Sequence, residues 1–227
     1  MGKKYIERVT KQMPKCSEEF VSSRKEEIIN ACASLYETMG FREITLGDIG
    51  EKTSFTRTSI YNYFQTKEEI FLALLQREHE AWASDLEDIY QKNDALTAAG
   101  FADAVARSLE KRECMLKLMA MNLYDLEGGS RMENLVAFKK AYAETLQAVT
   151  RCLEKFFPRM TAANRQEFLY MLFPFLFGIY PYTSATPKQK EAMEMARIRP
   201  PRYSIYDITS TFLTRQLRDF QQEESRS

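Results

Sequence analysis

The sequence predicts an all-α protein, with a small N-terminal three-helix domain that holds a helix-turn-helix and a larger C-terminal helical domain. Only eight glycines and seven prolines interrupt the 227 residues, and long segments are rich in the strong helix formers Leu, Glu, Lys, Ala and Met. Apolar residues make up 44% of the chain, which is enough for a substantial core. A chain of this length can accommodate a small domain joined to a larger one.

The N-terminal segment is polar and basic, and we expect residues 1–20 to form a flexible arm. A helix is predicted to begin near Ser23, because Ser23 is a favourable N-cap and Glu26 completes a capping box. One apolar face follows at helical spacing and consists of Ile28, Cys32, Leu35 and Met39. Gly40 is expected to end this helix in the left-handed conformation.

Further helix starts follow closely, since Thr45, Thr56 and Thr66 are each placed to cap a helix. The helix after Thr45 is short, and the helix after Thr56 is expected to run to about Tyr63. The helix after Thr66 is long. Very short helices between longer ones are typical of a helix-turn-helix, which we place at residues 21–68.

Residues 69–227 are expected to form a second domain of longer helices. The predicted helices cover residues 95–110, 112–126, 131–157, 162–182, 187–198 and 204–222. The strongest start signal is Thr186, because Pro187 occupies the first helical position and Gln189 the third. The most apolar run, 168–182, is short for a bilayer span and predicts a buried or interface helix.

The composition disfavours several classes of function. The 32 basic and 32 acidic residues balance, so net charge alone does not indicate a nucleic-acid partner. The four cysteines form no Cys-x-x-Cys pair, and without a secretory leader they predict reduced thiols in a cytoplasmic protein with no membrane partner. An enzyme is disfavoured because the only histidine, His79, is flanked by charges and is interpreted as solvated or close to a phosphate. We therefore expect no catalytic residue, metal or cofactor.

Residues 40–71 carry a long ordered pattern, made of Gly40-Phe41, Thr45, Asp48-Ile49, Ile60-Tyr61, Tyr63-Phe64 and Lys67-Glu68. This pattern resembles the tetracycline-repressor (TetR) family of bacterial transcription regulators over about residues 23–72. It departs from the family at Gly50, at Thr58 and in the turn, where Thr53-Ser54-Phe55 replaces the more usual Ala-Gly-Val.

The residues expected to contact DNA come from the start and end of the helix after Thr56 and from neighbouring helix starts. They are Thr45, Phe55, Thr56, Arg57, Thr58, Ser59, Tyr61, Tyr63 and Lys67. Residues at the N-terminus of a recognition helix contact base edges, and Arg57 is either a bidentate guanine ligand or a solvated arginine. The resemblance implies that Tyr61 contacts a phosphate and Tyr63 the bases or backbone; the alternative is that both are half-buried packing residues.

Several other residues of this region either contact DNA or have only a structural role. Phe55 either contacts a thymine methyl group or fills the turn. Ile60 and Phe64 share a helical face and are expected to anchor the recognition helix. The helix N-termini at Thr45 and Lys67 suit phosphate groups. The basic arm, with Lys3, Lys4 and Arg8, either enters an adjacent groove or is a solubilising tail.

The resemblance implies that the C-terminal domain binds a small molecule and dimerises, with helices at about 162–182 and 204–222 forming a homodimer interface. Candidate pocket residues, which also suit an ordinary core, are Met115, Met119, Tyr124, Phe138, Tyr142, Phe173 and Phe177. The expected function is a repressor that binds a near-palindromic double-stranded operator and is released by an apolar or amphipathic effector. The alternative is a helical small-molecule binder with a vestigial DNA-binding head.

Overall fold

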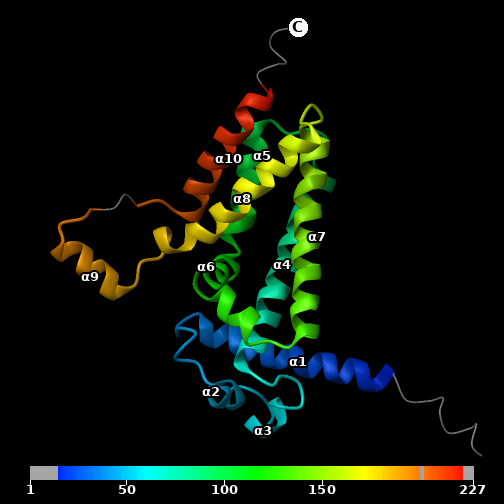
Figure 1. Cartoon of the computed structure of the whole chain (residues 1–227), viewed down its shortest axis with the longest axis vertical. Helices are drawn as coiled ribbons and strands as arrows, with labels where there is room; N and C mark the ends of the chain where they lie inside the picture. Colours follow the sequence, from blue (N-terminus) through cyan, green and yellow to red (C-terminus); the bar gives the residue numbers. More distant parts are fainter. Residues whose placement is uncertain (1–14, 200–201, 222–227) are drawn as a thin grey trace, which may run out of the picture. The chain divides into compact units, whose positions relative to one another are not determined.

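The computed structural model describes residues 15–199 and 202–221, and within these ranges the protein consists of ten helices and no strand (Figure 1). The expected all-α class is confirmed. The chain divides into two compact units, with the boundary between Ile70 and Phe71. The basic arm residues Lys3, Lys4 and Arg8 lie outside the described residues.

The N-terminal unit contains α1 (Lys15–Tyr36), α2 (Leu46–Glu51), α3 (Arg57–Ile60) and the first turn of α4 (Lys67–Lys92). Its core collects the apolar faces of these helices and of the loop between α1 and α2. The buried side chains include Ile28, Cys32, Leu35, Phe41, Ile44, Ile49, Ile60 and Phe64. The unit therefore buries the apolar face predicted for α1, except for Met39, which follows the helix and is only half-buried.

The start of α1 differs from the prediction, because the helix begins at Lys15 rather than near Ser23. Residues 15–20, expected to belong to the flexible arm, are helical. No glycine or proline separates this segment from the rest of the helix, so the serines before Arg24 do not interrupt it. The guanidinium of Arg24 lies 5.0 Å from the centre of the Phe20 ring, a contact between residues four apart that requires a helix here.

Gly40 does not take the predicted left-handed conformation, since no described glycine has a positive φ. The helix already ends at Tyr36, and the chain turns through a bond from the Met39 N–H to the Leu35 carbonyl oxygen. The Gly40 N–H then donates to Glu43 Oε2 at 2.6 Å. The recognition helix α3 is also shorter than expected, because it ends at Ile60 and continues to Tyr63 only as turns.

The C-terminal unit contains most of α4 and six more helices close to the predicted ranges. They are α5 (Ala98–Glu110), α6 (Glu113–Gly128), α7 (Met132–Phe156), α8 (Ala162–Thr183), α9 (Pro187–Met195) and α10 (Ile205–Gln221). Threonines define several starts: Thr97 caps α5, and Thr161 and Thr186 form capping boxes at α8 and α9.

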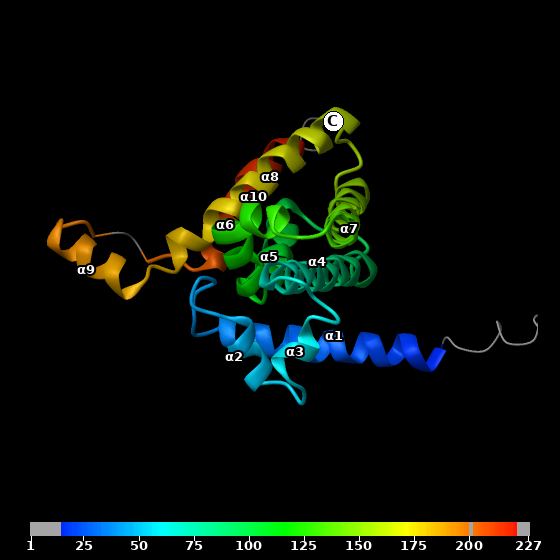
Figure 2. The same cartoon turned by 60° about the horizontal axis from the view of Figure 1, so that its bottom comes forward.

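Two pairs of helices lie side by side in this unit, α5 with α10 and α6 with α8 (Figures 1 and 2). Helix α10 buries every fourth residue, namely Ile205, Thr209, Leu213 and Leu217. The α5 helix buries the small side chains Ala98, Ala102 and Ala106, which permit close approach of a neighbour. Among the described helices none is alone long and apolar enough to cross a membrane; α8 and α9 reach that level only as a pair bent by 74°.

Candidate functional site

The turn between α2 and α3 is fastened to α1 by polar contacts. Arg24 Nη1 donates to Ser54 Oγ at 2.6 Å, and the Ser54 N–H donates to Glu27 Oε1. Hydrogen bonds from Ser54, first from its backbone and then from its side chain, hold the pKa of Glu27 below its ordinary value. Ser54, which stands where the family usually has a turn glycine, has no positive φ, so a residue with a side chain fits there without backbone strain.

The ring of Phe55 packs within the same turn. The Arg24 guanidinium lies 5.2 Å from its centre, and the Tyr63 ring lies 6.1 Å away at an interplanar angle of 53°. These contacts favour the interpretation in which Phe55 fills the turn. They also explain why Tyr63 is half-buried.

The segment from Thr56 to Gln65 has one buried side and one exposed side. Ile60 and Phe64 are buried, as expected for anchors. Thr56, Thr58 and Tyr61 are exposed, and the Tyr61 side chain is 47% accessible. Ser59 is half-buried and its Oγ lies 3.2 Å from Thr56 Oγ1, whereas the Thr56 side chain makes no capping hydrogen bond to α3. The side chain of Arg57 lies outside the described part of the structure.

Two polar residues on the exposed side were not singled out from the sequence. Asn62 and Gln65 are both exposed, and they continue the line that begins at Thr58 at helical spacings of four and three residues. The sequence contains a signal for the exposure of Asn62 and Gln65, because these polar positions alternate with the apolar Ile60 and Phe64. The aromatic residues between them drew the prediction to Tyr61 and Tyr63 instead.

Thr45 and Lys67 are both engaged within the protein. Thr45 Oγ1 accepts from the Asp48 N–H at 3.3 Å, and Asp48 Oδ2 accepts from the Thr45 N–H at 2.7 Å, which completes the expected capping box. Lys67 Nζ donates to the carbonyl oxygens of Phe41 at 2.7 Å and Ile44 at 3.2 Å. Lys67 thus fastens the loop before α2 to the start of α4, and its role as a phosphate contact stays a prediction.

In the C-terminal unit, rings from α4, α7 and α8 form a buried cluster that we call the aromatic cluster. Its members are Trp82, His79, Phe138, Tyr142 and Phe173. The centre of Tyr142 lies 5.2 Å from that of Phe173 and 5.5 Å from that of His79, both edge to face. His79 also lies 5.7 Å from Phe138, and Trp82 lies 6.3 Å from Phe173. Three predicted pocket residues, Phe138, Tyr142 and Phe173, therefore meet in one place.

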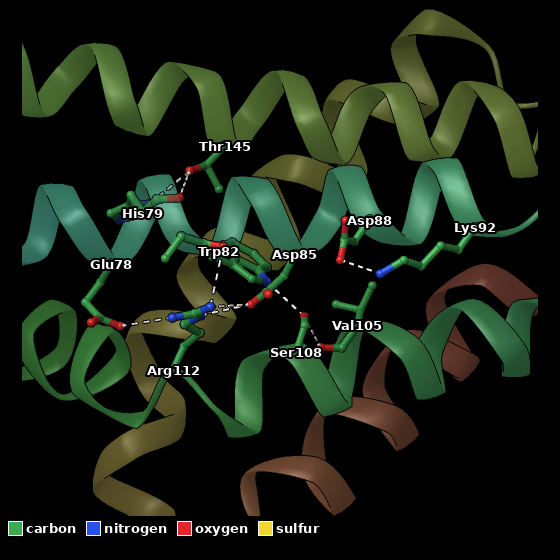
Figure 3. Close-up of polar contacts among 11 residues, drawn as sticks. Glu78, His79, Trp82, Asp85, Asp88, Lys92, Val105, Ser108, Arg112 and Thr145 are labelled. Carbon is green, nitrogen blue, oxygen red and sulfur yellow. Dashed lines mark hydrogen bonds and ion pairs between the residues drawn. The ribbon is translucent and has the colours of Figure 1, made fainter.

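The position of His79 contradicts the prediction of a solvated or phosphate-proximal residue, since its side chain is 1% accessible. Its Nδ1 lies 3.2 Å from Thr145 Oγ1, and the Thr145 hydroxyl lies within bonding distance of the Ala141 and His79 carbonyl oxygens (Figure 3). Burial, with a smaller effect of the Lys139 charge, lowers the pKa of His79 to about 4, so the imidazole is neutral. The spacing of Leu75, His79 and Trp82 on one helical face is the signal that predicts burial.

A polar network borders the same stretch of α4 (Figure 3). Arg112 Nη2 lies 2.7 Å from Asp85 Oδ2, and Arg112 Nη1 lies 3.9 Å from Glu78 Oε2. Burial raises the pKa of Glu78, although Arg112 opposes this shift. The Trp82 Nε1–H donates to Ser108 Oγ at 3.0 Å, so the only polar group of this buried ring is paired.

The other pocket candidates are not gathered in one place. Met115 and Met119 are buried on α6, and Phe177 on α8 is half-buried. Tyr124 differs from the expectation for a pocket residue, because its side chain is 92% accessible near the end of α6. In the described ranges, 15–199 and 202–221, no group of three or more His, Cys, Asp or Glu side chains is arranged to hold a metal ion.

Comparison with known families accounts for both units. The family model for bacterial regulatory proteins of the tetR family matches residues 28–74. The model for the tetracyclin repressor-like C-terminal domain matches residues 76–217, which is more than half of the chain. The two matches follow one another along the sequence and together include α2 to α9, the C-terminal part of α1 from Ile28 and most of α10.

Two relatives with curated sequences match over a short part of the chain. Two uncharacterized HTH-type transcriptional regulators of Bacillus subtilis (strain 168) are similar: YfiR is 32% identical over 63 residues, and YdgC is 39% identical over 59 residues. The matched segments cover 28% and 26% of this chain and 31% and 30% of those relatives. The chain thus spans less than a third of the length of the curated relatives it matches.

Solved structures are similar over nearly the whole chain. A candidate TetR-family transcriptional regulator from Mesorhizobium loti has a TM-score of 0.57 at 16% identity, and covers 89% of this chain and 97% of its own. The fatty acid degradation regulator FadR from Bacillus halodurans has a TM-score of 0.54 at 15% identity, with coverages of 86% and 94%. At such identities these structures show the fold. The family models, of which the C-terminal one matches more than half of the chain, show that this chain belongs to the TetR family of bacterial regulatory proteins, with the helix-turn-helix segment inside the N-terminal match.

Proposed function

We propose that this protein is a repressor that binds a near-palindromic operator as a homodimer and is released by a small apolar or amphipathic effector. The observation that carries the proposal is the two-sided segment 56–65, in which Ile60 and Phe64 are buried and the polar side chains face solvent. A vestigial head would not need to hold its turn in place, whereas here Arg24 and Glu27 fasten Ser54 to α1. A repressor of chromosomal genes acts in the cytoplasm.

The contacts with DNA would divide into two kinds. Thr58, Ser59 and the N-terminal Arg57 of α3 would face base edges, and Asn62 or Gln65 would extend that line. Tyr61 would donate its hydroxyl to a phosphate, which fixes the register of the helix without selecting a base. A twofold dimer would set two such helices about 34–36 Å apart and therefore require a near-palindromic site.

The dimer is proposed to form through α8 and α10, because α8 leaves an apolar stripe in solvent. The exposed residues of this stripe recur at helical spacing and are Met171, Pro174, Gly178, Pro181 and Tyr182. Solvent-exposed apolar stripes of this kind mark surfaces that contact another protein. The stacked rings of Phe175 and Phe212, 3.9 Å apart, join α8 to α10, so both helices would enter the interface as one surface.

The effector is proposed to act on the aromatic cluster. Aromatic side chains with a few polar groups suit an apolar or amphipathic ligand, and Tyr142, His79 and Thr145 supply those groups. His79 and Trp82 belong to α4, whose first turn lies in the DNA-binding unit. A ligand that shifts these rings would therefore act on a helix that both units share. The coupling must be reciprocal, so operator DNA would weaken effector binding by the same factor.

The test is selection of bound duplexes from a random DNA pool at near-physiological salt. We expect a palindrome that the Arg57→Ala/Tyr61→Phe double variant no longer enriches, whereas the control variant Tyr124→Ala, at an exposed site in the other unit, enriches it unchanged. The affinity for that palindrome should fall with salt, with a log–log slope of about −0.9 per phosphate contact. Failure to enrich any sequence, with and without added cell extract, would support the vestigial head instead.

A further inference from the structure

The segment between α8 and α10 forms a helix with no fully buried side chain, and of its residues only Met193 is half-buried. All nine residues of α9, from Pro187 to Met195, lack a buried side chain. Both views show α9 lying apart from α5, α6 and α8 (Figures 1 and 2). This is unusual, because the stability of most protein helices comes from packing of one face rather than from helix propensity.

The sequence nevertheless specifies both ends of α9. At its start, Thr186 and Gln189 form a capping box and Pro187 occupies the first turn. At its end, the Ile198 N–H donates to the Met193 carbonyl oxygen at 2.8 Å, and the Arg197 N–H donates to that of Glu194 at 3.0 Å. These two bonds form a Schellman motif.

The helix end also carries backbone strain. Arg197 has a φ of 56°, a conformation that costs a non-glycine residue about 1 kcal/mol or more. It is the one non-glycine residue with a positive φ in the described part of the chain. The capping box at the start of α9 and the Schellman motif at its end, with Arg197 at a positive φ, indicate that α9 is a folded helix and not one of many conformations of a loop.

One face of this element is apolar and uncovered. Ala192, Met193 and Ala196 share a helical face, and the Schellman turn brings Ile198 back toward Met193. Met195 is 80% accessible, and Ile198 and Tyr203 are more than half accessible. A nine-residue helix is marginal in water by itself, so a partner that covers this face would supply the missing stabilisation.

We infer that α9, with the flanking residues 184–199, is an arm that packs on the second copy of this chain. The inference rests on the proposed homodimer. The arm leaves the end of α8 beside the exposed Tyr182 and returns to the start of α10, so it is continuous with both helices of the proposed interface. A twofold axis through that interface would place the partner's surface beside both ends of the arm, while within its own unit Ala192 and Ala196 stay exposed and Met193 is only half-buried.

The first test weakens the apolar face of the arm. The double variant Met193→Ser/Ile198→Ser changes exposed or half-exposed side chains, so the subunit itself should keep its fold, which circular dichroism would verify. The variant removes two apolar side chains per arm from the proposed contact with the second copy. The dimer dissociation constant, measured by sedimentation equilibrium, should therefore rise about tenfold or more. The matched control Lys190→Ser/Glu194→Ser, on the other side of α9, should leave the constant within about twofold.

The second test identifies what the arm contacts. A photo-crosslinking amino acid at position 195 is introduced in a mixture of ¹⁵N-labelled and unlabelled protomers, and mass spectrometry then distinguishes links between copies from links within one copy. Crosslinked products that join a ¹⁵N-labelled protomer to an unlabelled one support the proposal that the arm packs on the second copy. Products confined to one copy, links only to DNA or to another protein, or an unchanged dissociation constant in Met193→Ser/Ile198→Ser would each overturn it. If the parent protein is monomeric at all concentrations, the proposed homodimer itself is wrong, and the arm with it.

Discussion

The two units of this protein are held together in different ways. In the N-terminal unit, polar contacts at or near the surface hold the helix-turn-helix together: Lys67 fastens a loop, Asp48 and Thr45 cap α2, and Glu27 holds Ser54. In the C-terminal unit, the candidate effector site lies in the interior, where His79 and Trp82 meet aromatic rings. One unit exposes the residues of its proposed site, and the other largely buries them.

This difference has a physical consequence. Changes at the exposed site should alter DNA binding with a modest cost in stability, because surface contacts contribute little to folding. Changes in the aromatic cluster should cost several kcal/mol, because interior side chains leave a cavity or an unpaired polar group. The following predictions test this contrast between the two units, and each compares two proteins that differ at the site in question.

The largest effect is expected for Trp82→Ala. The Trp82 side chain is fully buried and its indole N–H is paired, so truncation leaves a large cavity and should lower the free energy of unfolding by about 3–5 kcal/mol. Urea denaturation measures the loss. The exposed Tyr124→Ala serves as the control and should change stability by less than about 0.5 kcal/mol. Equal losses in the two variants would mean that Tyr124 is not an exposed residue.

The next effect concerns pH and His79. Its pKa of about 4 in the folded protein lies below the ordinary value of 6.5, so the unfolded chain takes up this proton first. The stability from neutral His79 is therefore complete above pH 6.5 and is lost as the pH falls from 6.5 to 4. The expected loss is about 2 kcal/mol at pH 5 and about 3 kcal/mol at pH 4.

The measurement is urea denaturation between pH 7.5 and pH 5, for the parent protein and for His79→Gln. The half-buried Glu78 has a raised pKa and opposes the trend, but it is present in both proteins and its effect cancels in the difference. The parent should lose stability toward pH 5, and the variant should lose about 2 kcal/mol less. Parallel profiles for the two proteins would show that His79 does not titrate as its burial requires.

A smaller effect is expected for Lys67→Met. The variant keeps the aliphatic stem of the side chain but loses the ammonium bonds to the Phe41 and Ile44 carbonyl oxygens, at a cost of about 2 kcal/mol. Lys140→Met, at an exposed site on α7, is the control. If Lys67 also contacts a phosphate, the log–log salt slope of operator binding should fall by about 0.9 in this variant and not in the control. No loss of stability would mean that the loop is held without Lys67.

The smallest effect is expected for Thr45→Ala, which removes the α2 cap at a cost of about 1 kcal/mol. Thr161→Ala removes the corresponding capping box at α8 and should cost about the same. Thermal denaturation compares the two losses, and operator titration compares the two affinities. Only Thr45→Ala should weaken operator binding; a similar loss of affinity in Thr161→Ala would show that stability alone explains it.

Local signals in the sequence predicted most of the fold. Thr45 and Thr186 cap the helices they were expected to cap, whereas the Thr56 side chain makes no capping bond, and Ile60 and Phe64 are buried as helical spacing predicts. These predictions succeed because caps and helix faces depend on residues within a few positions of one another. The start of α1 was missed because a serine is an acceptable N-cap and is also tolerated inside a helix.

The residues of the two proposed sites were predicted less completely than the helices. Arg57, Thr58 and Tyr61 fall at helix positions that a motif identifies, whereas Asn62 and Gln65 required knowledge of which side of the segment faces solvent. The neighbours of His79 in the chain are charged, and this suggested solvation. Its neighbours in space are Phe138, Tyr142 and Thr145, more than 50 positions away in the sequence, and they decide its burial.

The sequence by itself determined most of the helices, the family and the segment that we propose to contact DNA, because each depends on short-range spacing and on an ordered local pattern. Only the tertiary structure decided that His79 is buried and neutral, that Tyr124 faces solvent, and that Lys67 is bonded to the loop before α2. It also decided that α9 has no fully buried side chain. These properties depend on segments far apart in the chain, and the burial of a side chain is set by which of those segments pack against it.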